Sequence, residues 1–123
     1  MDEKDTHLTE EQHKVLREKE TEAPFSGEYV DMKEDGAFHC VGCGAKLFES
    51  DTKFDSGTGW PSFTDAIEGA VNFEVDDSHG MKRTEVTCAK CGGHLGHIFD
   101  DGPEDRGGKR YCINSCVLDF KEK

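Results

Sequence analysis

The fold of this chain is decided by a short pattern that occurs twice, as Cys40-Val41-Gly42-Cys43-Gly44 and as Cys88-Ala89-Lys90-Cys91-Gly92. In each copy two residues separate the cysteines, so both sulfurs can reach one ion around a tight turn. The glycine that follows permits the positive φ that such turns use. Four sulfurs around one ion leave no position open for substrate, so the pattern predicts a structural zinc site formed by Cys40, Cys43, Cys88 and Cys91.

Two other interpretations of the four cysteines are redox-active pairs and buried free thiols. A redox-active pair of this spacing normally lies at the N-terminus of a helix, and the glycine-rich surroundings here are not helical in character. The 44 residues between Cys43 and Cys88 exceed the gap of a small zinc ribbon. The metal is therefore expected to hold together two distant parts of one β domain.

Composition favours a small domain that needs such a staple. Of the 123 residues, 33% are hydrophobic and 34% are charged, which leaves material for only a lean core. This length predicts a single domain over residues 1–123, with residues 1–8 disordered. A net charge of −12 argues against a nucleic acid or an anionic membrane surface as partner. We expect a monomer.

The beginning of the chain predicts a helix rather than a targeting segment. Residues 1–12 contain no apolar run typical of a signal peptide, and nowhere do about 18 apolar residues follow one another. Six cysteines without a secretion signal indicate a reducing, cytoplasmic location. Thr9 and Gln12 fit a capping box, which predicts a short, largely exposed and loosely docked helix over residues 10–19.

Near the other end, residues 110–115 read Arg-Tyr-Cys-Ile-Asn-Ser and predict a strand. Alternation places Arg110, Cys112 and Asn114 on one face, where the positive charge favours the reactive thiolate of Cys112. The alternative is a cysteine that packs in the core. If the strand continues to Cys116, the two cysteines are about 13 Å apart, too far for a disulfide.

Between these stretches lie further strands and a set of candidate site residues. Strands are predicted over residues 70–75 and 81–87. Trp60 lies on a shaped, glycine-rich loop, where it either fills the core or offers an aromatic face to a methyl group beside sulfur. His94 and His97 suit acid–base chemistry, although residues three apart share no face of a regular strand unless the chain bends at Gly96.

Taken together, SGTGWPSF (56–63), GHLGHIFDDGP (93–103) and RYCINS (110–115), with the two cysteine pairs, resemble the methionine-R-sulfoxide reductases of the B type. The resemblance runs from about Leu8 to Phe120. It implies a mainly β fold in which two antiparallel sheets form a zinc-stapled, barrel-like β-tent, with short N-terminal helices and a zinc site remote from catalysis. It also implies the thiol-dependent reduction of methionine-R-sulfoxide in oxidised proteins, a repair activity under oxidative stress.

The resemblance carries roles over by position. Cys112 is the nucleophile, and His97 with His94 protonates the sulfoxide oxygen and positions the substrate. Trp60 and Phe99 bind the substrate. The residues expected to order the site and hold the thiolate are Asp101, Arg110 and Asn114.

One position departs from the family pattern. Many members carry a cysteine where this chain has Thr58, and that cysteine resolves the sulfenic acid formed on the nucleophile. A threonine cannot do so, and we therefore expect thioredoxin or another small thiol to reduce Cys112 directly.

Two rival functions use part of the same pattern. A non-enzymatic, zinc-stapled β domain could bind a peptide or small ligand through Trp60, but this leaves Arg110, Cys112 and the histidine pair unexplained. A zinc-ribbon nucleic-acid binder is disfavoured by the net charge of −12.

Overall fold

The structure, a computed structural model, describes residues 8–18, 20–21, 29, 34–54, 59–76 and 83–122, the side chain of Arg106 excepted. Within these ranges the helical elements are α1 (Glu10–Glu18) and the 3-10 turns η2 (Ser50–Thr52), η4 (Glu104–Arg106) and η5 (Ser115–Val117). The strands are β1 (Gly36–Cys40), β2 (Lys46–Glu49), β3 (Lys53–Phe54), β4 (Ser62–Phe63), β5 (Val71–Asp76), β6 (Arg83–Cys88), β7 (His94–Phe99), β8 (Arg110–Ile113) and β9 (Leu118–Glu122).

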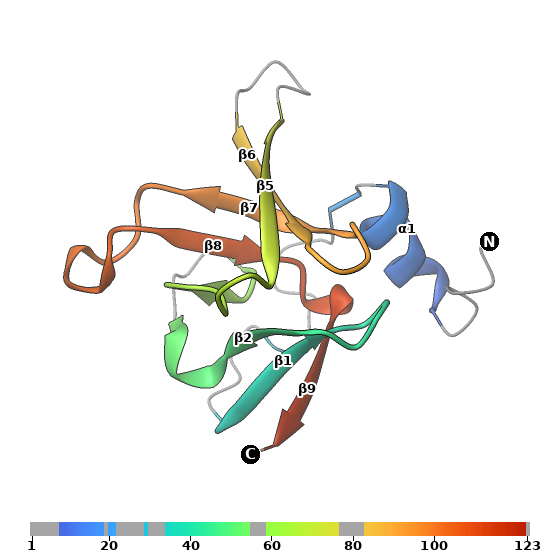
Figure 1. Ribbon diagram of the computed structural model, residues 1–123, viewed down its shortest axis with the longest axis horizontal. Helices are drawn as coiled ribbons and strands as arrows, with labels where there is room; N and C mark the ends of the chain where they lie inside the picture. Colours follow the sequence, from blue (N-terminus) through green and yellow to red (C-terminus); the bar gives the residue numbers. More distant parts are fainter. Residues whose placement is uncertain are drawn as a thin grey trace.

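The strands form two antiparallel sheets, as expected. The smaller sheet has the order β2-β1-β9 and the larger one the order β3-β4-β8-β7-β6-β5 (Figure 1). Each order ends in two edge strands, so the described strands form two open sheets and no closed barrel. The strand expected over residues 70–75 corresponds to β5. The strand expected over residues 81–87 corresponds to β6 from Arg83 onward, and residues 81 and 82 lie outside the described residues.

Aromatic side chains join the two sheets. Phe38 and Phe48 come from β1 and β2 of the smaller sheet, whereas Phe63 comes from β4 of the larger one, and all three are fully buried. The rings of Phe48 and Phe63 stack with centroids 4.3 Å apart, and Phe38 meets Phe63 edge-on at 5.2 Å. These large apolar surfaces form the contact between the sheets in a core that composition predicted to be lean.

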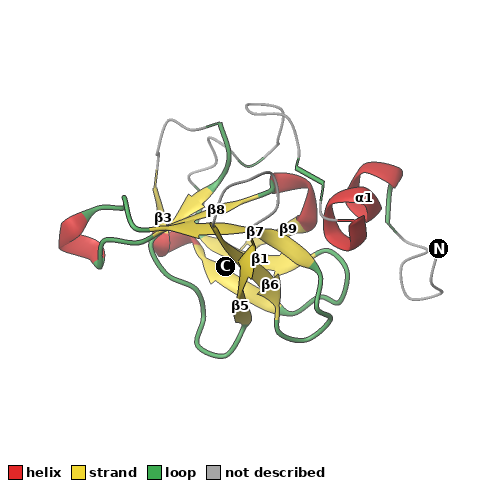
Figure 2. Cartoon of the chain, turned by 90° about the horizontal axis from the view of Figure 1, so that it is seen from above, coloured by secondary structure: helices red, strands yellow, loops and turns green. Residues whose placement is uncertain are grey.

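The helix α1 begins with the expected capping box. The Gln12 amide donates to Thr9 Oγ1 at 3.1 Å, and the Thr9 amide donates to Gln12 Oε1 at 2.8 Å. The helix lies at one side of the sheets, close to the turn between β6 and β7 (Figures 1 and 2). Its Val15 and Leu16 are buried, so it docks more tightly than expected. It is the one α-helix among the described residues, whereas several short helices were expected.

The strand that contains Cys112 is shorter than expected. It ends at Ile113, and residues 115–117 form η5, after which β9 continues in the other sheet. The turn η5 is therefore the corner at which the chain passes between sheets. Because the chain bends there, the 13 Å separation expected for Cys112 and Cys116 does not apply, and that argument against a disulfide was wrong.

Two further expectations concern residues outside the described part of the chain. Residues 1–7, most of the segment expected to be disordered, lie there, and so does Thr58.

Candidate active site and metal centre

The four cysteines of the repeated pattern lie close together, although the first pair begins at the end of β1 in the smaller sheet and the second at the end of β6 in the larger one. Their sulfurs all lie within 4.8 Å of one another. The Sγ atoms of Cys40 and Cys91 are 3.7 Å apart, and those of Cys43 and Cys88 are 3.5 Å apart. Four thiolates placed tetrahedrally 2.3 Å from zinc are about 3.8 Å from one another, so the cluster has the dimensions of a tetrahedral metal site.

The backbone around the two cysteine pairs follows the same course in both copies. The Gly44 amide donates to the Cys40 carbonyl, and the Gly92 amide donates to the Cys88 carbonyl, each at 2.8 Å. Both glycines have a positive φ, 80° and 76°, which confirms the reason for glycine at this position. Two turns with the same hydrogen bond and the same glycine conformation thus direct their sulfurs toward one point.

The cluster is closed on one side by α1. A Cβ built on Gly42 would lie 2.6 Å from Leu16, and one built on Gly93 would lie 2.4 Å from the same side chain. Arg17 also donates to the Cys91 carbonyl at 3.0 Å. Its positive charge is one of several causes that lower the pKa of Cys91, the largest being hydrogen bonds from Cys40 and Cys88. The cluster could hold a metal ion with no position left for substrate.

A second group of residues lies on one face of the larger sheet. Cys112 on β8 is directly opposite His97 on β7, and Arg110 is directly opposite Phe99. In an antiparallel pair, residues directly opposite each other project to the same face, with Cβ atoms about 5 Å apart. Residues two apart in a strand also share a face. Cys112, Arg110, His97 and Phe99 therefore form one contiguous patch.

Arg110 is held beside Cys112 by two neighbours. Its Nε donates to Asp101 Oδ1 at 2.9 Å, and its guanidinium lies 4.5 Å from the centre of the Phe99 ring. The hydrogen bond to Asp101 is the largest cause that raises the pKa of Arg110, and interaction with the Cys112 thiol raises it further. The structure thus places the guanidinium beside the thiol, on the face where their alternation predicts it.

The two histidines also share this face, for a reason that spacing alone did not reveal. On β6 the consecutive residues Val86 and Thr87 are opposite Gly96 and His94, which leaves Leu95 as an extra residue in β7. Such a β-bulge shifts the alternation by one residue. The rings of His94 and His97 consequently meet edge-on with centroids 5.4 Å apart.

Asn114 fixes this bulge to the end of the nucleophile's strand. Its backbone amide and its side-chain Nδ2 both donate to the Leu95 carbonyl, at 2.9 and 3.0 Å. Asn114 is buried, so these hydrogen bonds are shielded from water. The side chain expected to order the site thus ties the bulge that carries the histidines to the strand that carries Cys112.

Trp60 is half-buried at the same end of β8. The amide of Ile113 donates to the carbonyl of Pro61 at 3.0 Å, and Ser62 is directly opposite Cys112 across β4 and β8. The loop that carries Trp60 is therefore anchored to the strand of the nucleophile.

Comparison with known proteins agrees with this geometry. A model of the SelR domain matches residues 8–122. The chain belongs to the SelR family.

Curated SelR relatives match the chain over most of its length. A protein of Bradyrhizobium diazoefficiens is 62% identical, and the match covers 91% of this chain and 81% of the relative. Proteins of Chromohalobacter salexigens and Methanosarcina mazei are each 56% identical, over 92% and 94% of this chain and 86% and 83% of their own. All three are named peptide methionine sulfoxide reductase MsrB.

A solved structure of a protein with a different name has a similar fold. The Mis18 "Yippee-like" domain superimposes with a TM-score of 0.58 at 18% identity, over 73% of this chain and 98% of its own. At that identity the similarity concerns the fold alone. Among the described residues of the SelR chain, no helix is long and apolar enough to cross a membrane.

Two acidic residues that the sequence did not single out contact the two histidines. Nδ1 of His94 lies 2.7 Å from Oε2 of Glu85, and Nε2 of His97 lies 2.8 Å from Oδ2 of Asp76. Glu85 is only 1% exposed, which is rare for a carboxylate. Nothing in a strand reading Arg-Thr-Glu-Val-Thr-Cys distinguishes a buried glutamate from an exposed one, because the covering elements come from elsewhere in the chain.

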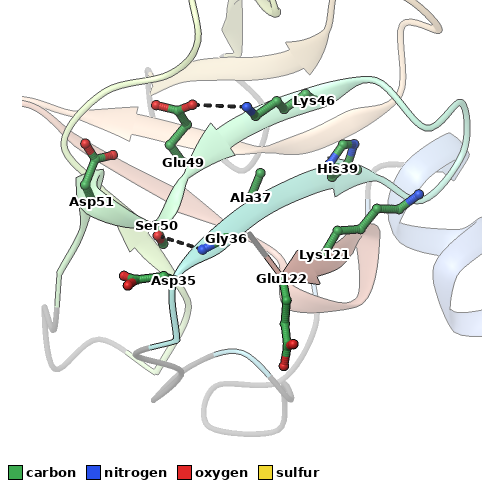
Figure 3. A pocket seen from close by; sticks show the side chains of 10 residues that line it. All are labelled: Asp35, Gly36, Ala37, His39, Lys46, Glu49, Ser50, Asp51, Lys121 and Glu122. Carbon is green, nitrogen blue, oxygen red and sulfur yellow. Dashed lines mark hydrogen bonds and ion pairs between the residues drawn. The ribbon is translucent and has the colours of Figure 1, made fainter.

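A polar groove of about 380 Å³ lies on the smaller sheet, away from these residues. Figure 3 shows it between β1, β2 and β9, with Lys46 paired to Glu49 and the Gly36 amide donating to Ser50 Oγ. It is lined by charges of both signs and contains no thiol and no residue predicted for the site.

Proposed function

We propose that this chain is a peptide-methionine (R)-S-oxide reductase, in which Cys112 attacks the sulfoxide sulfur. The observation that carries the proposal is that Cys112 lies directly opposite His97 and shares a face with Arg110. The relatives' names point to the same reaction. A cysteine that merely filled the core would need neither a guanidinium nor an imidazole beside it.

The chemistry follows from the positions of these groups. Arg110 favours the thiolate of Cys112, which is the nucleophilic form. The thiolate attacks the electrophilic sulfur while His97, assisted by His94, supplies a proton to the sulfoxide oxygen. The bond formed between the two sulfurs then breaks as the hydroxyl group passes from the substrate sulfur to the Cys112 sulfur. Methionine leaves with two electrons more than the sulfoxide had, and Cys112 becomes a sulfenic acid. Trp60 and Phe99 offer aromatic surface for the methyl group beside sulfur.

Asp101 and Asn114 take supporting parts in this proposal. Asp101 orients Arg110 through two hydrogen bonds, at 2.9 and 3.3 Å. Asn114 fixes the bulge through Leu95. Neither has to touch the substrate for its loss to lower the rate, because each sets the position of a group that does.

We assign structural zinc to Cys40, Cys43, Cys88 and Cys91. Four thiolates favour zinc, and an ion with four protein ligands is closed to substrate. When bound, the zinc supplies no chemistry to the reaction and holds the two cysteine turns together. Thiolates that bind zinc stay reduced in a reducing compartment. We extend the proposal to a cytoplasmic repair protein that acts under oxidative stress.

Recycling of Cys112 is proposed to use an external thiol such as thioredoxin. The first thiol displaces water from the sulfenic acid and forms a mixed disulfide, and a second thiol releases the Cys112 thiolate. Mass spectrometry of enzyme treated with substrate alone should find a trapped sulfenic acid at Cys112. An intramolecular Cys112–Cys116 disulfide would instead show that the chain resolves itself.

The test of the reaction is single-turnover reduction of a methionine sulfoxide peptide, with the R and S epimers measured separately. We expect the R epimer alone to be reduced, and we expect Cys112→Ser to abolish this while the matched control Cys116→Ser retains it. If neither epimer reacts although the fold and the metal are intact, the chain is a binding module rather than an enzyme.

A further inference from the structure

We propose that two carboxylates, Glu85 and Asp76, act as positioning residues that fix the tautomers of His94 and His97, and thereby the nitrogen that His97 directs toward the substrate. This inference rests on the proposed reductase function and deepens it. It starts from the contacts of the two rings, since each imidazole has one nitrogen within hydrogen-bond distance of a different carboxylate.

The first step concerns the proton on each ring. An ionised carboxylate only accepts hydrogen bonds, so the nitrogen that faces it must carry the hydrogen. Glu85 faces Nδ1 of His94, whereas Asp76 faces Nε2 of His97. The two neutral rings are therefore held in opposite tautomers, His94 with its hydrogen on Nδ1 and His97 with its hydrogen on Nε2. A further proton is taken up by Nε2 of His94 or by Nδ1 of His97, and the protonated His97 ring donates from Nδ1 in the proposed reaction.

The second step concerns direction. In the larger sheet β7 lies between β8 and β6, and β5 lies beyond β6. Asp76, at the end of β5, thus holds His97 from the side away from Cys112 on β8. A cysteine, a histidine and an orienting carboxylate in that order form the arrangement used by enzymes with activated nucleophiles.

The third step concerns the cost of burial. Glu85 and His94 are 1% and 3% exposed. A buried carboxylate is strongly unfavourable unless it is paired, and a core position of this kind is normally apolar. Asp76 is more accessible and has a second neighbour, the Arg83 guanidinium at 3.7 Å. Apolar side chains could fill such positions without the cost of burying a charge. Stability alone therefore does not account for two carboxylate–imidazole pairs beside one thiol.

The proposal has a spectroscopic test that does not depend on turnover. Long-range ¹H–¹⁵N spectra, recorded where both imidazoles are neutral, should identify His94 as the Nδ1–H tautomer and His97 as the Nε2–H tautomer. The variant Asp76→Ala removes the acceptor from a partly exposed position and should change the tautomer of His97. An unchanged His97 tautomer in this variant, or a His94 that carries its hydrogen on Nε2, would overturn the inference.

Kinetics test whether the fixed tautomers matter. Asp76→Ala and Glu85→Gln should each lower kcat about 10-fold to 100-fold with little change in KM, a part of the roughly 100-fold to 10,000-fold that a general acid contributes. Glu74→Gln is the matched control, because Glu74 shares the face of β5 with Asp76 but is exposed. Equal rates for Asp76→Ala and Glu74→Gln would overturn the inference.

A double-mutant cycle separates positioning from a general structural effect. If Asp76 acts through His97, then Asp76→Ala should cost nothing further in a His97→Asn background. Fully additive losses would contradict a role through His97. If the wild-type chain reduces neither epimer, the proposed function fails, and the spectra still show whether the carboxylates fix the two rings.

Discussion

Gly96 offers a way to move the nucleophile without altering any group that takes part in the reaction. It lies on β7, where the backbone of β8 passes very close, and a Cβ built on it would be 2.0 Å from the Cys112 carbonyl oxygen. Real Cβ atoms essentially never come within 3.0 Å of such an atom, so Gly96→Ala must push the strands apart by at least about 1 Å. The displaced residue is Cys112 itself.

The expected effect follows from that distance. A misplacement of about 1 Å in a catalytic group lowers the rate about 100-fold, which corresponds to about 2.7 kcal/mol of activation free energy. The assay is single-turnover reduction of a methionine-R-sulfoxide peptide by Gly96→Ala, at a temperature where circular dichroism shows that the variant is folded. The four cluster cysteines should keep their metal, since the clash lies on the Cys112 strand.

The matched control is Gly36→Ala in the smaller sheet. A Cβ there would lie 2.3 Å from the Lys121 carbonyl oxygen, so the clash is of similar size but is remote from Cys112. Both variants should lose stability, and only Gly96→Ala should lose activity in the folded state. Wild-type turnover by Gly96→Ala, or an equal loss in Gly36→Ala, would refute the reasoning.

Three further predictions concern the metal cluster, the helix and the ion pair. Cys88→Ser should release the bound metal and lower the melting temperature, as measured by metal analysis and calorimetry, because three thiolates no longer close the site. Leu16→Ala, in a side chain 1% exposed, should cost about 3 kcal/mol of unfolding free energy and about 12 °C in the melting temperature. Asp101→Asn should lower kcat at neutral pH, whereas acidification to about pH 5 should leave the Arg110–Asp101 pair intact. The hydrogen bond that Asp101 accepts from Arg110 lowers the pKa of Asp101 below 3.8. The contribution of the pair to stability is therefore present above that value and is lost only as the pH falls through the lowered pKa. Titration of the carboxylate by NMR can follow this loss.

Much of the fold and of the site could be predicted from local pattern. The two cysteine turns, the capping box at Thr9 and the shared face of Arg110 and Cys112 each depend on residues close together in sequence. Such features are set by backbone geometry over a few residues, so spacing alone identifies them. The structure bears out the cluster and the cap, and it places His97 opposite Cys112.

The features that could not be predicted depend on which segments become neighbours. The bulge at Leu95 exists because β7 has one more residue than the stretch of β6 that it pairs with, and neither strand reveals this alone. Directly after the end of β8 at Ile113, the Leu95 carbonyl accepts hydrogen bonds from the backbone amide and from Nδ2 of Asn114, a contact between segments far apart in sequence. The corner that follows moves Cys116 off the line of the strand.

The metal cluster and the reaction site are connected through one hairpin, although they do not share residues. The turn between β6 and β7 is the second cysteine turn itself, since Cys88 ends β6 and His94 begins β7. An ion that binds Cys88 and Cys91 therefore fixes the length of the turn. The length of the turn sets the register of β7 against β6, in which the bulge forms at Leu95, one residue after His94. If the turn slipped by one residue, His94 would move to the opposite face and lose Glu85. If the cluster holds the structural metal proposed above, that ion contributes in this way to the alignment of the histidines with Cys112.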